Sequence, residues 1–252
     1  MIKLENCEVV GWEHALRGMR NPKNSWNRSD SHTCEFSCDG CDNFTNCNNN
    51  FEPYYKRFWE GGPVDCDFAI GSNDHELAMK LAKGGPVHAK YRRMITVYVD
   101  ITAPLYWWKE FDTYKVGTVA NSCSTMHKIH EKRFEMSDFS TEHLLPASYK
   151  ALGFTVKTLN ECRDLFLGCS GFKDAYGEHD KKDYWWQMIQ LLPSSYNQKR
   201  TIMLNYEVLT GIYESRKNHK LDEWHEFCKW IETLPYSELI TGEREVEQDE
   251  NS

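Results

Sequence analysis

Apolar and polar residues alternate along two stretches of the chain, and this spacing predicts β-strands. Residues 2–10 alternate weakly and indicate a first strand. Residues 94–102 alternate more clearly and are rich in Val, Ile and Thr, which favour strands. Ala103-Pro104 is predicted to end this second strand, because proline has no N–H to donate to a neighbouring strand.

Apolar residues three and four positions apart predict helices in most of the remaining chain. A helix is expected from about residue 73 to 84, where Asn73 or Asp74 would cap its start and Gly84-Gly85 would end it. The apolar spacing predicts further helices over residues 159–167, 183–192, 198–216 and 221–234. Residues 11–20 could hold a short helix, and the aromatic segment 105–111 is expected to be helical. The pattern therefore predicts a single α+β domain over residues 1–240 with a helical C-terminal half.

Composition supports a packed protein. The chain has 252 residues, 40% hydrophobic and 13% aromatic, which supplies enough large apolar side chains for a core. No apolar run approaches the roughly 18 residues of a membrane helix, and no signal peptide is evident, so a cytoplasmic protein without a membrane partner is expected. The net charge is −8, so no nucleic-acid partner is expected. Residues 241–252 form an acidic tail that is expected to be flexible.

Four of the ten cysteines lie in one polar segment. Residues 21–50 are rich in Asn and Ser with little periodicity, and they are expected to form an irregular insertion. Four thiolates suit tetrahedral zinc, the spacing of the first three also resembles the iron–sulfur loop of radical S-adenosylmethionine enzymes, and a third alternative is four unliganded thiols. The candidate metal ligands are Cys34, Cys38, Cys41 and Cys47. The other six cysteines are expected to pack as small buried side chains.

Other polar groups are less specific. A basic cluster just before the second strand is either a phosphate site or a solvated strand entry, and it consists of Lys90, Arg92 and Arg93. Cys123 lies near His127 and His130, but nothing else in the sequence supports a Cys–His nucleophile pair. No glycine-rich phosphate-binding motif is present.

The segment that runs from His88, through the strand ending at Ala103-Pro104, to Lys115 and Met126 resembles the central part of flavin-dependent thymidylate synthases. In that family a His-containing turn leads into a strand that ends in Ala-Pro, and an Arg-His-Arg signature begins nine residues after the proline. Here the strand ends at Ala103-Pro104, and the same count reaches Thr113-Tyr114-Lys115. The spacing of the C-terminal half is similar as well, at Leu192-Pro193, Tyr196, Asn205, Leu209 and Arg216. The resemblance covers roughly residues 75–234 and implies an antiparallel or mixed sheet packed with helices.

The resemblance also implies roles for individual residues. Arg216 matches the arginine that favours negative charge on the pyrimidine ring, so it is the candidate catalytic residue. The expected cofactor-binding residues are His88, Lys115, Thr118, Asn121 and Asn205. The expected substrate-binding residues are Cys123, Ser124, Thr125 and Arg216. The implied cofactor is FAD, the implied partners are a pyrimidine nucleotide and other copies of the chain in a dimer or tetramer, and NADPH and methylene-folate are needed only for catalysis.

Several arginines of the family pattern are replaced. The signature Arg-His-Arg becomes Thr-Tyr-Lys, and Ile189 and Glu207 stand at two further arginine positions. These replacements remove bidentate anion recognition. Lys90, Arg92 or Arg93 could replace the missing charge in space.

Three functions remain open: an enzyme that carries out reductive C5 methylation of deoxyuridine monophosphate or a related reaction, a non-catalytic nucleotide-binding or regulatory homologue, and a metal-dependent interaction module centred on the cysteine-rich segment.

Overall fold

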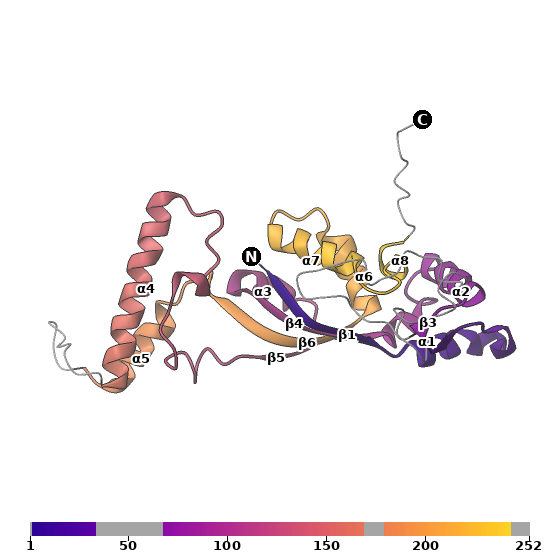
Figure 1. Cartoon of the computed structure of the whole chain (residues 1–252), viewed down its shortest axis with the longest axis horizontal. Helices are drawn as coiled ribbons and strands as arrows, with labels where there is room; N and C mark the ends of the chain where they lie inside the picture. The colour runs from indigo at the N-terminus through magenta and orange to yellow at the C-terminus, as the bar shows by residue number, and fades with distance from the viewer. Residues whose placement is uncertain (1, 34–67, 169–178, 243–252) are drawn as a thin grey trace, which may run out of the picture. The chain divides into compact units, whose positions relative to one another are not determined.

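The computed structural model describes residues 2–33, 68–168 and 179–242, and over these ranges the chain is an α+β protein, as predicted. A four-stranded sheet has the order β1-β4-β6-β5, and β2 pairs antiparallel with β3. Figure 1 shows the elements, which in chain order are β1 (Lys3–Val10), α1 (Trp12–Arg20), β2 (His32–Thr33), β3 (Phe68–Ala69), α2 (Ser72–Lys83), the 3-10 turn η5 (Lys90–Arg93), β4 (Thr96–Pro104), α3 (Leu105–Phe111), β5 (Val119–Ser122), α4 (Pro146–Leu167), α5 (Lys181–Gln190), β6 (Asn197–Asn205), α6 (Tyr206–Arg216), α7 (Asp222–Glu232) and α8 (Glu238–Thr241).

Most of the elements predicted from periodicity are confirmed, but the single helix predicted over residues 198–216 is wrong. The chain is a strand through Asn205 and becomes a helix only at Tyr206. Gln198, Ile202 and Leu204 are buried, and their even spacing fits a strand rather than a helix. Among the described residues, no helix is both long and apolar enough to cross a membrane. The candidate metal ligands Cys34, Cys38, Cys41 and Cys47 and most of the acidic tail lie outside the described residues.

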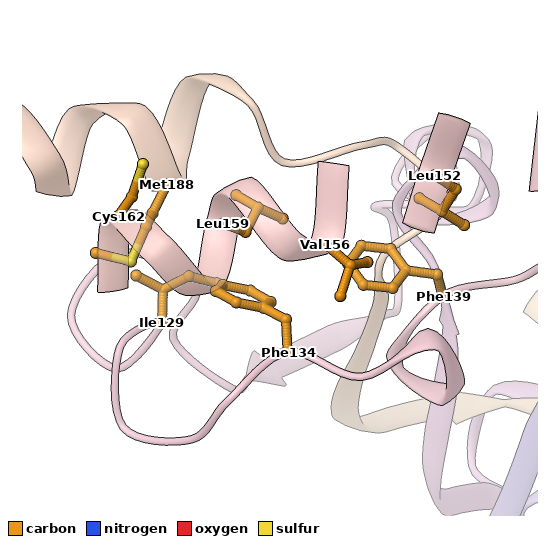
Figure 2. Close-up of a cluster of buried hydrophobic side chains, with 8 residues drawn as sticks. All are labelled: Ile129, Phe134, Phe139, Leu152, Val156, Leu159, Cys162 and Met188. Atoms are coloured by element: carbon orange, nitrogen blue, oxygen red, sulfur yellow. The ribbon is translucent and has the colours of Figure 1, made fainter. Parts of the chain in front are cut away.

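The described chain divides into two compact units, and the first comprises residues 1–3, 102–113 and 121–200. Within it α4 and α5 lie side by side (Figure 1). Their shared core holds eight buried side chains, drawn in Figure 2: Ile129, Phe134, Phe139, Leu152, Val156, Leu159, Cys162 and Met188. Asn160 is buried beside them. Its Oδ1 accepts a hydrogen bond from Phe134 N and its Nδ2 donates one to the Phe134 carbonyl, each of 2.9 Å, so both polar atoms of the side chain have a partner.

The second unit comprises residues 4–101, 114–120 and 201–252, and its described part has an aromatic core. Trp12 meets Tyr206 and Tyr236 edge to face, with ring centroids 5.4 and 5.3 Å apart. Gly11 precedes Trp12 with a φ of +95°, and a side chain there would place its Cβ 2.2 Å from the carbonyl oxygen of Met94. Only glycine allows this approach, which lets α1 pack against η5.

Asp74 is the buried polar centre of the second unit. Its carboxylate accepts hydrogen bonds from Arg20 Nε at 2.5 Å and from the hydroxyls of Ser29 and Ser31 at 2.6 and 2.7 Å. Burial by itself raises the pKa of Asp74, but the two serines and Arg20 outweigh burial and hold this pKa below its usual value. Gly71 is the N-cap of α2, so the prediction that Asn73 or Asp74 is the cap is wrong. Asp30, from a distant segment, accepts from the backbone N–H groups of both residues instead.

We expect Asp74→Ala to lower the free energy of unfolding by about 3–5 kcal/mol, because it leaves the Arg20 guanidinium buried without its anion. Urea unfolding of the variant at neutral pH measures this loss. Because folding lowers the pKa of Asp74, the ionised carboxylate stabilises the fold fully above its unfolded pKa of about 4. This stabilisation is lost as the pH falls from there through the lower pKa of the folded state. Glu76→Ala, at an exposed position of the same helix, should change stability by no more than about 0.5 kcal/mol. A loss at Asp74 as small as that would contradict the prediction.

Candidate functional site

Arg216, the candidate catalytic residue, is held by two aromatic side chains of the second unit. Its Nε donates a hydrogen bond of 2.8 Å to the hydroxyl of Tyr114. Its guanidinium carbon lies 4.7 Å from the ring centroid of Trp224 and 5.5 Å from that of Tyr114. A planar guanidinium favours such stacking, and the hydrogen bond fixes its rotation. Arg216 is therefore an oriented cation rather than a freely moving one.

Local packing explains how α6 delivers Arg216 to this place. Leu209 and Ile212 are fully buried on one face of α6, which fixes the rotation of the helix about its axis. Arg216 lies in the last turn, where a cation is also favoured by the helix dipole. The chain then reverses, with His219 N donating to the carbonyl of Arg216 at 2.9 Å. This turn brings Trp224, which is fully buried at the start of α7, against the guanidinium.

Two of the predicted cofactor-binding residues lie near the other end of α6: Asn205, which directly precedes the helix, and Thr118, from the loop before β5. Asn205 caps the helix, with its Oδ1 accepting from Val208 N at 3.1 Å. Gly117, with a φ of +79°, lies so close that an added Cβ would be 3.1 Å from Asn205 Nδ2. Thr118 follows directly, and its hydroxyl is buried without a hydrogen-bond partner. Lys115 is exposed in the same loop. The structure thus gathers Lys115, Thr118 and Asn205 around the start of α6.

Arg92, in the basic cluster of η5, lies beside the first turn of α6. Arg92 is buried, with 6% of its surface exposed, whereas Lys90 and Arg93 are exposed. Arg92 Nη1 lies 3.8 Å from Glu207 Oε2, on the first turn of α6. The positive charge of Arg92 is therefore opposed by a carboxylate of the chain itself. Burial raises the pKa of the adjacent Tyr91 to about 12, so this phenol stays protonated and donates to the carbonyl of Ala78.

The remaining predicted site residues are distributed over both units. His88, in the second unit, is exposed beside Gly84 at the end of α2. Asn121, Cys123, Ser124 and Thr125 belong to the first unit. Cys123 there is an exposed free thiol whose backbone pairs with β6, through its N–H to Lys199 and its carbonyl from the Gln198 side chain. Over the residues that the structure describes, no group of three or more His, Cys, Asp or Glu side chains could hold a metal ion.

Sequence reasoning missed the partners of the two arginines. Tyr114 appeared only as a replacement for a family histidine, and Glu207 only as a lost arginine. In the structure each is the contact that holds a guanidinium. The sequence offered one general signal: an arginine that is removed from water needs a partner. Periodicity does not identify which residue that partner is.

Comparisons with known proteins place the fold. The sequence matches no protein-family model and no curated protein. The structure is similar to thymidylate synthase X from Helicobacter pylori, solved with FAD and dUMP, with a TM-score of 0.57 and 15% identity over 96% of this chain and 98% of that one. A second structure of the flavin-dependent enzyme from the same organism, also complexed with FAD and dUMP, gives the same TM-score and identity over 95% and 98% of the two chains. The likeness confirms the predicted fold, that of flavin-dependent thymidylate synthases.

We expect Tyr114 and Arg216 to stabilise each other by about 1 kcal/mol, which is below the roughly 1.5–3 kcal/mol of a hydrogen bond to a charged group because both residues are partly exposed to water. A double-mutant cycle with Tyr114→Phe and Arg216→Met measures this energy from the unfolding of the two single variants and the double variant. A parallel cycle that pairs Tyr213→Phe with Arg216→Met should give a coupling near zero, because the hydroxyl of Tyr213 donates to Glu232 instead. Equal couplings in the two cycles would rule out a specific Tyr114–Arg216 interaction.

Proposed function

We propose that this protein binds FAD and a pyrimidine deoxynucleotide, and that it acts on the nucleotide as a flavin-dependent thymidylate synthase-like enzyme. The observation that carries the proposal is the orientation of Arg216 by Tyr114 and Trp224, on a fold shared with enzymes of that kind. A fixed guanidinium can stabilise the negative charge that develops on a pyrimidine ring, without reorganising during the reaction.

The residues at the start of α6 suit part of a flavin dinucleotide. The unpaired hydroxyl of Thr118 and the amide of Asn205 offer hydrogen bonds to a polar cofactor, and the exposed Lys115 offers a charge to phosphate. The carboxylate of Glu207 does not suit phosphate, so phosphate binding would depend on Lys115 rather than on the first turn of α6. When bound, the flavin supplies the hydride; the chain's own contribution is to bind and orient the two ligands and to stabilise charge.

The substrate-side roles follow from the same proposal. Arg216 would bind the base. That Cys123, Ser124 and Thr125 contact the nucleotide stays a prediction from the family resemblance. For a full catalytic cycle the protein would also use methylene-folate and NADPH. The homo-oligomer, dimer or tetramer, remains part of this proposal, as does the assignment of residues 1–240 to one domain.

A second candidate is a nucleotide-binding protein without catalysis. It is favoured by the same contacts, because the Nε of Arg216 is already engaged by Tyr114 and the charge of Arg92 by Glu207. Both functions require ligand binding, so binding is tested first and turnover second.

Titration of the purified protein with FAD, followed by quenching of the flavin fluorescence, should show saturable binding. Arg216→Ala should lower the affinity for deoxyuridine monophosphate by at least tenfold, which corresponds to about 1.4 kcal/mol of binding free energy. The affinity for FAD should stay within a factor of three of the wild-type value. Lys217→Ala removes the neighbouring exposed cation and should leave both affinities unchanged. Absence of FAD binding would sink the proposal.

Turnover separates the two candidates. With deoxyuridine monophosphate, methylene-folate and NADPH, we expect FAD-dependent formation of the C5-methylated nucleotide by the wild-type protein and none by Arg216→Ala. Saturable binding of both ligands without any product would instead establish the non-catalytic candidate.

A further inference from the structure

Three polar atoms around the first turn of α6 are buried and have no hydrogen-bond partner. They are Arg92 Nε, Glu207 Oε2 and Thr118 Oγ1. All three belong to the second unit, and the loop that carries Thr118 packs on the helix cap through Gly117. Buried polar groups in folded proteins nearly always have a partner, so three such atoms beside one helical turn indicate that something else completes it.

Arg92 and Glu207 do not complete each other. Their nearest atoms, Nη1 and Oε2, are 3.8 Å apart, which is an ion-pair contact but too long for a hydrogen bond. A buried ion pair stabilises a protein only when further hydrogen bonds satisfy its remaining donors and lone pairs. The pair therefore presents a donor, Arg92 Nε–H, and an acceptor, Glu207 Oε2, that remain to be matched.

The charge at this turn disfavours an anion. The N–H groups of a helix N-terminus attract negative charge, but here the carboxylate of Glu207 already lies in the first turn. Arg92 balances that carboxylate and leaves no net positive charge for a phosphate. Arg92 Nε and Glu207 Oε2 are themselves buried, but the turn reaches the surface beside them, since 17% of the Glu207 side chain is exposed and Asn205 is half-buried. A neutral group that carries both a donor and an acceptor suits this turn best.

We propose that Arg92 and Glu207 bind an imide edge, in which a ring N–H lies beside a carbonyl. Glu207 Oε2 accepts from the N–H, Arg92 Nε donates to the adjacent carbonyl oxygen, and Thr118 Oγ1 adds a further hydrogen bond. Both residues are specificity-determining, because a site built around a hydrogen bond rejects analogues that lack it. This inference rests on the proposed function and deepens it: uracil and the flavin ring both carry an imide edge.

Methylation of the imide nitrogen tests the inference and identifies the source of the edge. The probes are two pairs, deoxyuridine with N3-methyldeoxyuridine and riboflavin with 3-methylriboflavin, whose dissociation constants are measured by calorimetry. In one of the two pairs, we expect the methylated probe to bind the wild-type protein at least tenfold more weakly than the unmethylated one. The pair that shows this difference identifies the ring that is bound at the start of α6. A weakening below twofold in both pairs would overturn the inference.

Variants separate recognition from stability. The double variant Arg92→Met/Glu207→Leu removes both polar groups at similar volume, an exchange that buried ion pairs often tolerate. The methylation ratio is the dissociation constant of the N3-methylated probe divided by that of the unmethylated probe. In the double variant, this ratio should fall below twofold. Glu207→Gln keeps an amide oxygen for the N–H and should retain at least a threefold ratio, smaller than that of the wild type. Glu214→Gln, an exposed acid near the other end of α6, should leave the ratio unchanged.

The outcomes distinguish this inference from the function on which it rests. If the ligands bind but the double variant discriminates as the wild type does, Arg92 and Glu207 do not read the imide, and the proposed function stands. If the double variant does not fold, Glu207→Gln is compared with Glu214→Gln, and a weakening by methylation that is as large in Glu207→Gln as in Glu214→Gln overturns the inference. If no flavin or pyrimidine probe binds the wild-type protein, the proposed function fails and this inference fails with it.

Discussion

The arrangement of the second unit depends on the hydrogen bond by which Asn205 caps α6. The strand β6 ends at Asn205, whose Oδ1 accepts from Val208 N and so fixes the residue at which the backbone turns from extended to helical. Tyr206 N donates to the carbonyl of Ile95, which anchors the first helical residue to the start of β4. A start one residue later would rotate the helix by about 100° and remove every side chain of α6 from its present face. Glu207 would then leave Arg92, and Arg216 would leave Trp224.

In this geometry, two arginines of the second unit are held by other side chains of the same unit. A guanidinium that is removed from water needs an anion, a hydrogen-bond acceptor or an aromatic face, because desolvation of an unpaired charge costs several kcal/mol. Arg92 is opposed by Glu207, and Arg216 is held by Tyr114 and Trp224. The chain lacks several arginines of the flavin-dependent thymidylate synthase pattern, and these two cations are oriented by its own side chains. The Arg92–Glu207 pair is therefore better suited to a neutral hydrogen-bonding group than to dense negative charge.

Periodicity predicted elements whose burial follows one face, such as α7, but it failed at β6 and α6. The stretch 202–209 places apolar residues at spacings that satisfy a strand in its first half and a helix in its second, and no glycine or proline marks the change. The cap that decides the boundary is an asparagine within an apolar run. Candidate residues such as Arg216 and Asn205 came from spacing shared with a family. Their contacts could not be predicted, because Tyr114 and Arg216 are 102 positions apart and only the tertiary fold joins them.

The Arg92–Glu207 pair argues that the start of α6 does more than hold the fold together. A buried ion pair contributes little net stability, and apolar residues of similar volume often serve a core as well or better. Packing alone therefore gives no reason to place a guanidinium, a carboxylate and a hydroxyl at this turn and leave an atom of each unmatched. The Asp74 centre in the same unit is a useful contrast, since its carboxylate is saturated by donors from Arg20, Ser29 and Ser31. Arg20 Nη2 is unmatched there as well, but around the first turn of α6 the guanidinium, the carboxylate and the hydroxyl each carry an unmatched atom, which a ligand explains better than the demands of folding.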